Sequence, residues 1–222
     1  MAPTLTNPVP TKPTKLVCFS FAAYAKTLID HLRSLHVPIL PGLTDQEFSL
    51  IESTFHFTFP PDLRSILREG LPVGPHFPNW RSSSPQQLRI LLDLPFLNLL
   101  KNVSKNGFWV DSWGARPTDR DKTMKLAKRV VGDNGDGTYD VPVLVPILWN
   151  CYVPATCPSV SGNPVFHVDD KGVRVIGNDL TTFFHEVDRW LGVNSACNGE
   201  GINVPAWAAT EPRRVEFWTE RS

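Results

Sequence analysis

Apolar residues recur at intervals of three and four through residues 20–36, which is the spacing of one face of an α-helix. The positions that fit this face are Phe21, Ala25, Leu28, Leu32 and Leu35. Pro38 cannot continue a helix, because its ring removes a backbone donor and clashes with the preceding turn. The pattern therefore predicts an amphipathic helix from about Ser20 to His36.

Two further helices carry capping signals of their own. Thr44 and Glu47 have the spacing of a capping box, in which each side chain bonds the other residue's backbone N–H, so we expect a helix up to about Phe55. The next segment has a proline in its first turn, and Gly70 follows it where a left-handed C-cap would fall. These signals predict a short helix over residues 61–69.

Two longer apolar stretches complete the first half of the chain. Ser84 is expected to cap a helix that Pro95 interrupts, with a short continuation through Leu99. Thr118 is expected to cap another helix that runs to Gly132.

Alternation of period two replaces the helical spacing after residue 140. Residues 141–148 indicate a buried strand. Residues 165–168 and 173–176 indicate the two arms of a hairpin, because the turn at 169–172 ends in a glycine where positive φ is easily adopted.

The last part of the chain is expected to return to the sheet. Asn178 or Asp179 should cap a final helix that reaches about Leu191. Residues 193–212 indicate a surface excursion, and residues 215–218 indicate an edge strand.

Helices come first and strands later, which is typical of an α+β fold with N-terminal helices packed on a mainly antiparallel sheet. Residues 1–15 are rich in proline and threonine and are predicted to be a disordered tail. Residues 16–222 are predicted to form a single domain.

Composition narrows the classes of partner. Of the 222 residues, 41% are hydrophobic and 20% charged, which is enough for one buried core. The 22 basic and 22 acidic residues cancel, so no charge excess favours nucleic acid or an anionic membrane. No apolar run approaches the roughly 20 residues of a membrane span. We therefore predict no nucleic-acid partner and no membrane partner.

The N-terminal region admits a second interpretation. Lys12 and Lys15 precede an apolar run, residues 16–25, that ends in an Ala-Tyr-Ala triplet and so resembles a secretory signal. The helical spacing continues beyond this run, which favours the helix, and a plastid or mitochondrial transit peptide is the lesser alternative. The predicted location is the cytoplasm, with the nucleus or a plastid as alternatives.

Metal and cofactor sites are not indicated. Cys151 and Cys157 stand six positions apart, too far for a C-x-x-C pair. The chain has no His-Glu-x-x-His sequence, no glycine-rich phosphate loop and no nucleophile elbow. The sequence therefore predicts no metal site and no cofactor.

Two places could supply acid–base chemistry. Period two puts His167 and Asp169 on one face of a strand, where a carboxylate can orient an imidazole. Asp111 stands between Trp109 and Trp113, and burial between two indoles would raise its pKa. An ordinary sheet face and an ordinary turn account for the same residues and are favoured, but the catalytic interpretation stays open.

Tryptophans beside turns are the main candidates for a binding surface. Core packing explains most tryptophans, and the alternative is an aromatic-walled cleft. The candidate binding residues are Trp80, Arg81, Trp109, Asp111, Trp113, Trp149, Tyr152 and Asn163. We expect Trp80 and Arg81 to be anchored, because the proline-rich turn before them has little freedom to lose on folding.

Residues 59–81, FPPDLRSILREGLPVGPHFPNWR, resemble a segment of the SUKH (Smi/Knr-like) superfamily. Further similarities follow in the same order: NGFW at 106–109 with WGARP at 113–117, VPI at 145–147, GNPVF at 162–166, GNDL at 177–180 and RRVEFW at 213–218. The resemblance is strongest over residues 44–218, and the chain is identified as a eukaryotic, plant-like member.

This resemblance implies an α+β domain that works by binding. Fungal members are regulators of cell-wall assembly that scaffold partners, and bacterial members are immunity proteins that bind toxins. No catalytic residues come with the family. We therefore expect a non-enzymatic protein-binding or scaffolding module, with a small-molecule ligand as the other kind of partner. The alternative is a cofactor-independent lyase, isomerase or cyclase that uses Asp111, His167 and Asp169.

Overall fold

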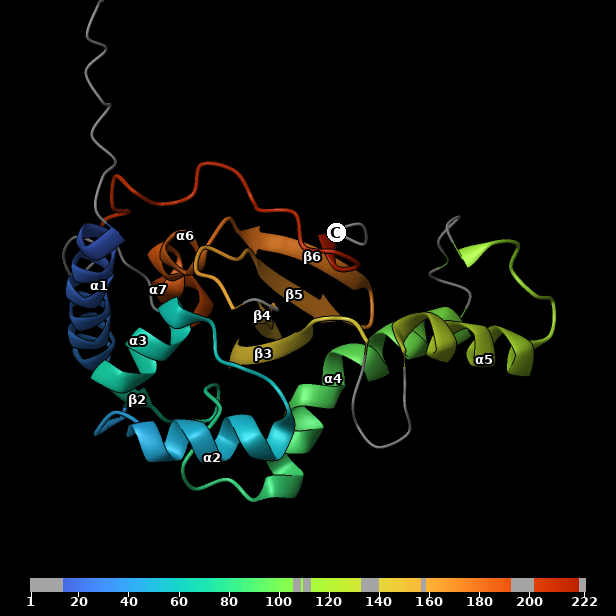
Figure 1. The fold of residues 1–222 in the computed structure, drawn as a ribbon, viewed down its shortest axis with the longest axis horizontal. Coiled ribbons are helices and arrows are strands. Elements are labelled where there is room, and N and C mark those ends of the chain that lie inside the picture. Colours follow the sequence, from blue (N-terminus) through green and yellow to red (C-terminus); the bar gives the residue numbers. More distant parts are fainter. Residues whose placement is uncertain are drawn as a thin grey trace, which may run out of the picture.

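Among the residues that the structure describes, the helices and strands follow the expected order: five helices up to residue 131, the main sheet from residue 143, and the last two helices after it (Figure 1). This computed structural model describes residues 14–105, 109, 113–132, 140–156, 159–192 and 202–219, without the side chains of residues 14–20, 130 and 131. The helices are α1 (Thr14–Ser34), α2 (Asp45–Phe55), α3 (Pro61–Glu69), α4 (Pro85–Ser104), α5 (Arg120–Val131), α6 (Leu180–His185) and α7 (Val187–Trp190). The strands are β1 (Ile39–Leu40), β2 (Leu71–Pro72), β3 (Val143–Leu148), β4 (Cys151–Ala155), β5 (Val165–Asp169) and β6 (Gly172–Gly177).

The main sheet is an antiparallel meander in the order β3-β4-β5-β6. The α+β class with antiparallel strands is thus confirmed, and so is the β5–β6 hairpin, in which Asp169 pairs with Gly172. Strand β4 was not predicted, because the pattern around Trp149 and Pro154 gave no strand signal. A second sheet pairs β1 with β2.

Local capping signals predicted the early helices closely. The Thr44 capping box is present, with the Glu47 N–H donating to the Thr44 hydroxyl at 3.2 Å. Helix α3 has the predicted bounds. The left-handed cap at Gly70 was wrong, since Gly70 is extended and leads directly into β2. A Cβ there would lie 2.8 Å from Ile39 and 2.9 Å from Ile29, so close packing requires this glycine.

Helix α4 is longer than predicted. Its Ser84 cap is present, but Pro95 lies inside a helix that continues to Ser104. The two halves of α4 bury different side chains, so packing on both sides of Pro95 outweighs the missing backbone hydrogen bond. Helix α5 is capped by Asp119 rather than Thr118, because the Asp119 carboxylate accepts from the N–H groups of two residues in the first turn.

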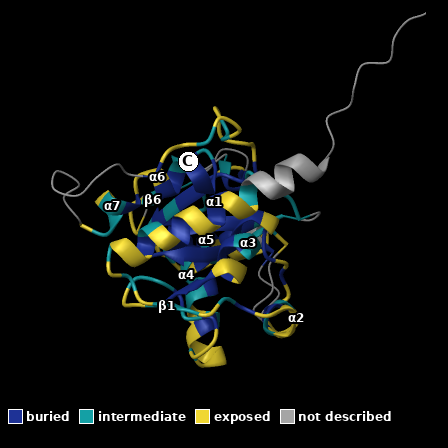
Figure 2. Cartoon of the chain, turned by 90° about the vertical axis from the view of Figure 1, so that its left-hand side faces the viewer, coloured by how far each residue is buried: buried dark blue, intermediate teal, exposed yellow. Residues whose placement is uncertain are grey.

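Both faces of the main sheet are covered by apolar side chains. Figure 2 shows the strands coloured as buried, with helices that carry exposed residues lying over them. On one face, helices α1, α2, α3 and α6 pack against Val145, Val153 and Val165 to form cluster one. On the other face, the second half of α4, α5 and the C-terminal segment pack against Tyr152, Phe166 and Val168 to form cluster two. The first half of α4 belongs to cluster one.

Helix α1 is part of the core. Leu28, Ile29 and Leu32 are fully buried in cluster one. His31 Nε2 lies 2.6 Å from Asp188 Oδ1, which ties α1 to α7. The helix begins at Thr14, earlier than expected, and residues 1–13 of the predicted tail lie outside the described residues.

The C-terminal segment differs from its prediction. The final helix divides at Glu186 into α6 and α7, and Asp179 is the cap. Residues 215–218 are not a strand. Trp218 is instead fully buried in cluster two, and its indole N–H donates to the Pro142 carbonyl at 2.7 Å. Side-chain burial, not strand pairing, therefore holds this segment.

Candidate functional site

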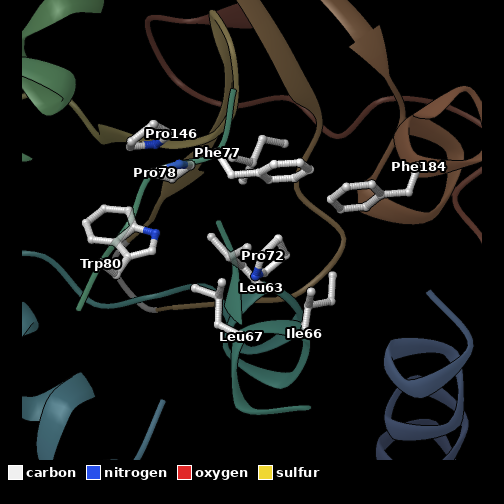
Figure 3. A pocket seen from close by; sticks show the side chains of 10 residues that line it. Leu63, Ile66, Leu67, Pro72, Phe77, Pro78, Trp80, Pro146 and Phe184 are labelled. Atoms are coloured by element: carbon white, nitrogen blue, oxygen red, sulfur yellow. The ribbon is translucent and has the colours of Figure 1, made fainter. Parts of the chain in front are cut away.

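Trp80 is a buried core residue. Trp80 is 3% exposed and contacts Phe57 and Phe59. Figure 3 shows that residues of α3, the following turn, β3 and α6 converge on one small apolar cavity of about 20 Å³. Its lining residues are Leu63, Ile66, Leu67, Pro72, Phe77, Pro78, Trp80, Pro146, Ile147 and Phe184. A space of this size and polarity is a packing defect rather than a ligand site, so Trp80 acts in folding.

Arg81 is anchored as well. Its guanidinium pairs with the Glu47 carboxylate at 2.5 and 3.0 Å and donates to the carbonyls of Pro41 and Gly42 at 2.9 and 3.0 Å. The hydrogen bond from Arg81, with help from Thr44, lowers the pKa of Glu47 to about 2. The charge of Arg81 is therefore engaged in joining the proline-rich turn to the start of α2.

Trp109 and Trp113 lie together beside cluster two. Their rings meet edge to face at 5.2 Å, and Trp113 is 7% exposed. The Trp109 indole donates to the Gly114 carbonyl at 2.8 Å, and the Arg116 guanidinium lies over its ring at 5.4 Å. Asp111 lies outside the described residues.

Tyr152 and Asn163 lie in the interior. Tyr152 is 1% exposed on the cluster-two face of the sheet, and burial raises the pKa of its hydroxyl. Asn163 is fully buried and donates to the carbonyls of Pro154 and Val160, both at 3.1 Å. Neither side chain is available to a partner at the surface.

His167 and Asp169 share a face, as period two predicts. Their nearest side-chain atoms are 3.6 Å apart, and Arg174 approaches both at 3.2 and 3.3 Å. Burial lowers the pKa of His167 and outweighs the charge of Asp169, which raises it. Burial would raise the pKa of Asp169, but the Lys171 N–H, His167 and Arg174 lower it. The Asp169 carboxylate is engaged in the hairpin turn, and His167 stacks near Trp190.

Among the described aromatic candidates, Trp149 is the exposed one, with 54% of its surface open to solvent. It is the first residue of the two-residue turn between β3 and β4. The ring of Trp149 stacks on His76, with centroids 3.8 Å apart and planes at 13°, and the backbone N–H of Trp149 donates to the His76 carbonyl at 2.8 Å. His76 Nδ1 is buried and has no hydrogen-bond partner among the described residues.

The backbone of Trp149 is left-handed, with φ of 49°. Three other non-glycine residues in the described part of the chain have positive φ: His36, His56 and Phe217. The two histidines follow helix ends, where this conformation is usual, and Phe217 is buried in cluster two. Trp149 has neither explanation, and glycine or asparagine would be the usual residue at its place in the turn.

A hollow of about 260 Å³ opens beside this stack. It is lined by Pro75, His76, Phe77, Pro78, Leu91, Leu94, Pro146, Trp149 and Asn150. From helix α4, Leu91 and Leu94 line the hollow. Ile90 and Leu97 neighbour Leu94 on the helix surface at spacings of four and three, and they are 56% and 52% exposed. We call the set Trp149, His76, Ile90, Leu91, Leu94 and Leu97 the Trp149 surface.

Sequence reasoning selected Trp149 but missed the rest of this surface. A usable signal was present in α4. Leu88, Leu92 and Phe96 form its buried stripe, while Ile90, Leu94 and Leu97 form a second apolar stripe at spacings of four and three. A helix that is apolar on two sides has a second apolar contact to make.

The structure thus places the candidate catalytic residue His167 and the candidate cleft residue Trp113 on opposite faces of the main sheet. His167 of β5 pairs with Cys151 of the neighbouring strand β4, and Cys151 faces cluster one. Trp113 belongs to cluster two, so the sheet lies between His167 and Trp113. No group of side chains able to hold a metal ion occurs among the described residues. Within that same part of the chain, no helix is both long and apolar enough to cross a bilayer.

Comparison with known proteins found no matching family model, no matching curated protein and no matching solved structure. The similarity to the SUKH superfamily therefore stays a prediction from the motifs.

Proposed function

We propose that the protein is a non-enzymatic protein-binding module of the SUKH type and that the Trp149 surface is its docking site. The observation that carries the proposal is an exposed tryptophan in a left-handed backbone conformation. A left-handed conformation costs an L-residue about 1–2 kcal/mol. Since burial does not offset this cost at Trp149, a role in contact with a partner explains why an indole stands there.

The composition of the surface supports the same proposal. Tryptophan is enriched among the residues that dominate binding energy in protein interfaces. Three of the six large apolar side chains that are exposed in the described part of the chain lie here: Ile90, Leu97 and Trp149. The Nδ1 of His76, which has no hydrogen-bond partner in the part of the chain that the structure describes, adds a second local cost. Strain and exposed apolar area coincide at one place, as expected for a contact surface.

The enzyme alternative receives less support. It requires His167 and an aromatic cleft at Trp109 and Trp113 to face one substrate, but these groups lie on opposite sides of the sheet. The Asp169 carboxylate is held by the N–H groups of Lys171 and Gly172 at 2.8 and 3.2 Å. These hydrogen bonds in the hairpin turn account for the position of the Asp169 carboxylate without a catalytic role.

Affinity capture from a native extract tests the proposal. The full chain is used as bait, together with Trp149→Ala and the matched control Trp207→Ala, whose indole is 40% exposed beside Phe21 and Tyr24. We expect the same proteins to bind the wild type and Trp207→Ala but to be depleted at least tenfold on Trp149→Ala. Equal recovery on all three baits would contradict the proposal. A fluorescent fusion would test the accompanying expectation of a cytoplasmic location.

A further inference from the structure

The hollow beside Trp149 is lined largely by rigid side-chain rings. Three of its lining residues, Pro75, Pro78 and Pro146, are prolines, and the stacked rings of His76 and Trp149 form another wall. Grooves lined by aromatic rings are the usual receptors for proline-rich segments, whose pyrrolidine rings pack flat against an indole.

The extent of the surface favours a short segment over a folded partner. A stable interface between folded proteins covers about 800 Å² on each side. On the Trp149 surface, the described large apolar side chains that are exposed are Ile90, Leu97 and Trp149, and the hollow that Trp149 lines has a volume of about 260 Å³. A linear peptide that inserts a few side chains suits this area, whereas a second copy of the chain would need a larger one.

The polar groups at the rim discriminate between conformations of such a peptide. The indole N–H of Trp149 and the side-chain amide of Asn150 are in exposed residues and make no hydrogen bond to the described part of the chain. A helical peptide satisfies its own carbonyls, but a polyproline II segment has no internal hydrogen bonds and leaves its carbonyls free to accept. Donors beside this hollow therefore favour the polyproline II form.

We propose that the hollow between Trp149, His76 and Leu94 binds a short proline-rich segment of a partner protein in the polyproline II conformation. This rests on the proposed function and specifies the partner's chemistry. Proline rings pack against the Trp149 indole and between Leu91 and Leu94, and the Trp149 and Asn150 donors bond carbonyls of the segment. The free energy of binding comes largely from the indole, since the peptide is already extended before it binds.

Isothermal titration calorimetry of the full chain tests the proposal with two synthetic peptides of equal length. One repeats Pro-Pro-Leu, and the other repeats Ala-Ala-Leu and forms a helix. We expect saturable binding of the Pro-Pro-Leu peptide only. Trp149→Ala should weaken it by roughly 30-fold or more, the factor that corresponds to an aromatic hot spot of about 2 kcal/mol. Trp207→Ala should leave the affinity unchanged.

The remaining outcomes separate this inference from the proposed function. Binding of the Ala-Ala-Leu peptide with loss in Trp149→Ala would overturn the polyproline II assignment while keeping Trp149 as a docking residue. If neither peptide binds but partners from the extract still depend on Trp149, the polyproline II assignment is likewise overturned and Trp149 stays a docking residue. If neither peptide binds and capture from extract is the same for Trp149→Ala, both proposals fail.

Discussion

At the scale of single residues, Trp149 and Asp62 both occupy places that are unfavourable for their side chains. Trp149 is left-handed at a turn, and Asp62 is a carboxylic acid that is 2% exposed in α3. Asp62 accepts hydrogen bonds from the N–H groups of Gly162 at 2.8 Å and Leu63 at 2.9 Å, which holds the loop before β5 against α3. Substitution of either residue should therefore change the free energy of unfolding measurably.

We expect the usual order of alanine and glycine to be reversed at position 149. Both Trp149→Ala and Trp149→Gly remove the indole, so the difference between them reports the backbone. Glycine should give the more stable protein by about 1 kcal/mol, because it adopts positive φ without a Cβ clash. Urea unfolding of the two variants measures this. Alanine more stable than glycine would show that the turn relaxes to negative φ.

Asp62 should make stability depend on pH. Burial raises the pKa of Asp62 to about 6 despite the hydrogen bonds from Gly162 and Leu63. The folded protein therefore holds this proton more tightly than the unfolded chain, so the stabilisation is complete below about pH 4 and is lost as the pH rises through about 6. We expect the stability of wild type minus that of Asp62→Asn to fall by about 2 kcal/mol between about pH 4 and pH 7. A difference that stays constant across this range in urea unfolding would refute the assignment.

At the scale of elements, the helix caps could be predicted from the sequence, but the tertiary contacts could not. Thr44, Ser84 and Asp179 cap helices through residues two or three positions away, so their signals are local. Gly70 was assigned a left-handed cap because its need for space comes from Ile29 and Ile39, which are distant in sequence. In the same way, Trp149 could be selected as an aromatic beside a turn, but its contact with His76 could not.

Helix α4 allows its two apolar faces to be tested separately. Leu92 is 2% exposed and Leu97 is 52% exposed. Leu92→Ala should lower the free energy of unfolding by about 2–5 kcal/mol, whereas Leu97→Ala should change it by less than about 1 kcal/mol. Denaturant titration distinguishes the two. Leu97→Ala should also weaken capture of the partners that Trp149→Ala loses; if it does not, the docking site is confined to the turn.

At the scale of the whole molecule, one sheet carries two apolar clusters on opposite faces. Each strand contributes alternate residues to both, so Phe166 packs in cluster two while Val165 packs in cluster one. Disruption of either cluster should therefore disturb the same strands. This arrangement predicts that the two clusters unfold together rather than in succession.

Trp80→Ala and Trp218→Ala probe the two clusters independently. Trp80 packs in cluster one and Trp218 in cluster two, and both are buried. Each substitution should lower the free energy of unfolding by about 3–5 kcal/mol and leave a single transition. Circular dichroism and tryptophan fluorescence should report the same midpoint in each variant. A second transition, or a midpoint for Trp80→Ala equal to that of the wild type, would show that the clusters are independent or that Trp80 is not part of the core.

The contact between α1 and α7 also sets an order of events during synthesis. His31 and Asp188 are 157 positions apart, as are Tyr24 and the carbonyl of Thr181 that its hydroxyl bonds. The apolar face of α1 is therefore made first, but it acquires its last partners only when α6 and α7 have left the ribosome. Until then, Leu28, Ile29 and Leu32 remain incompletely covered, and the nascent chain offers a chaperone binding site that disappears on completion.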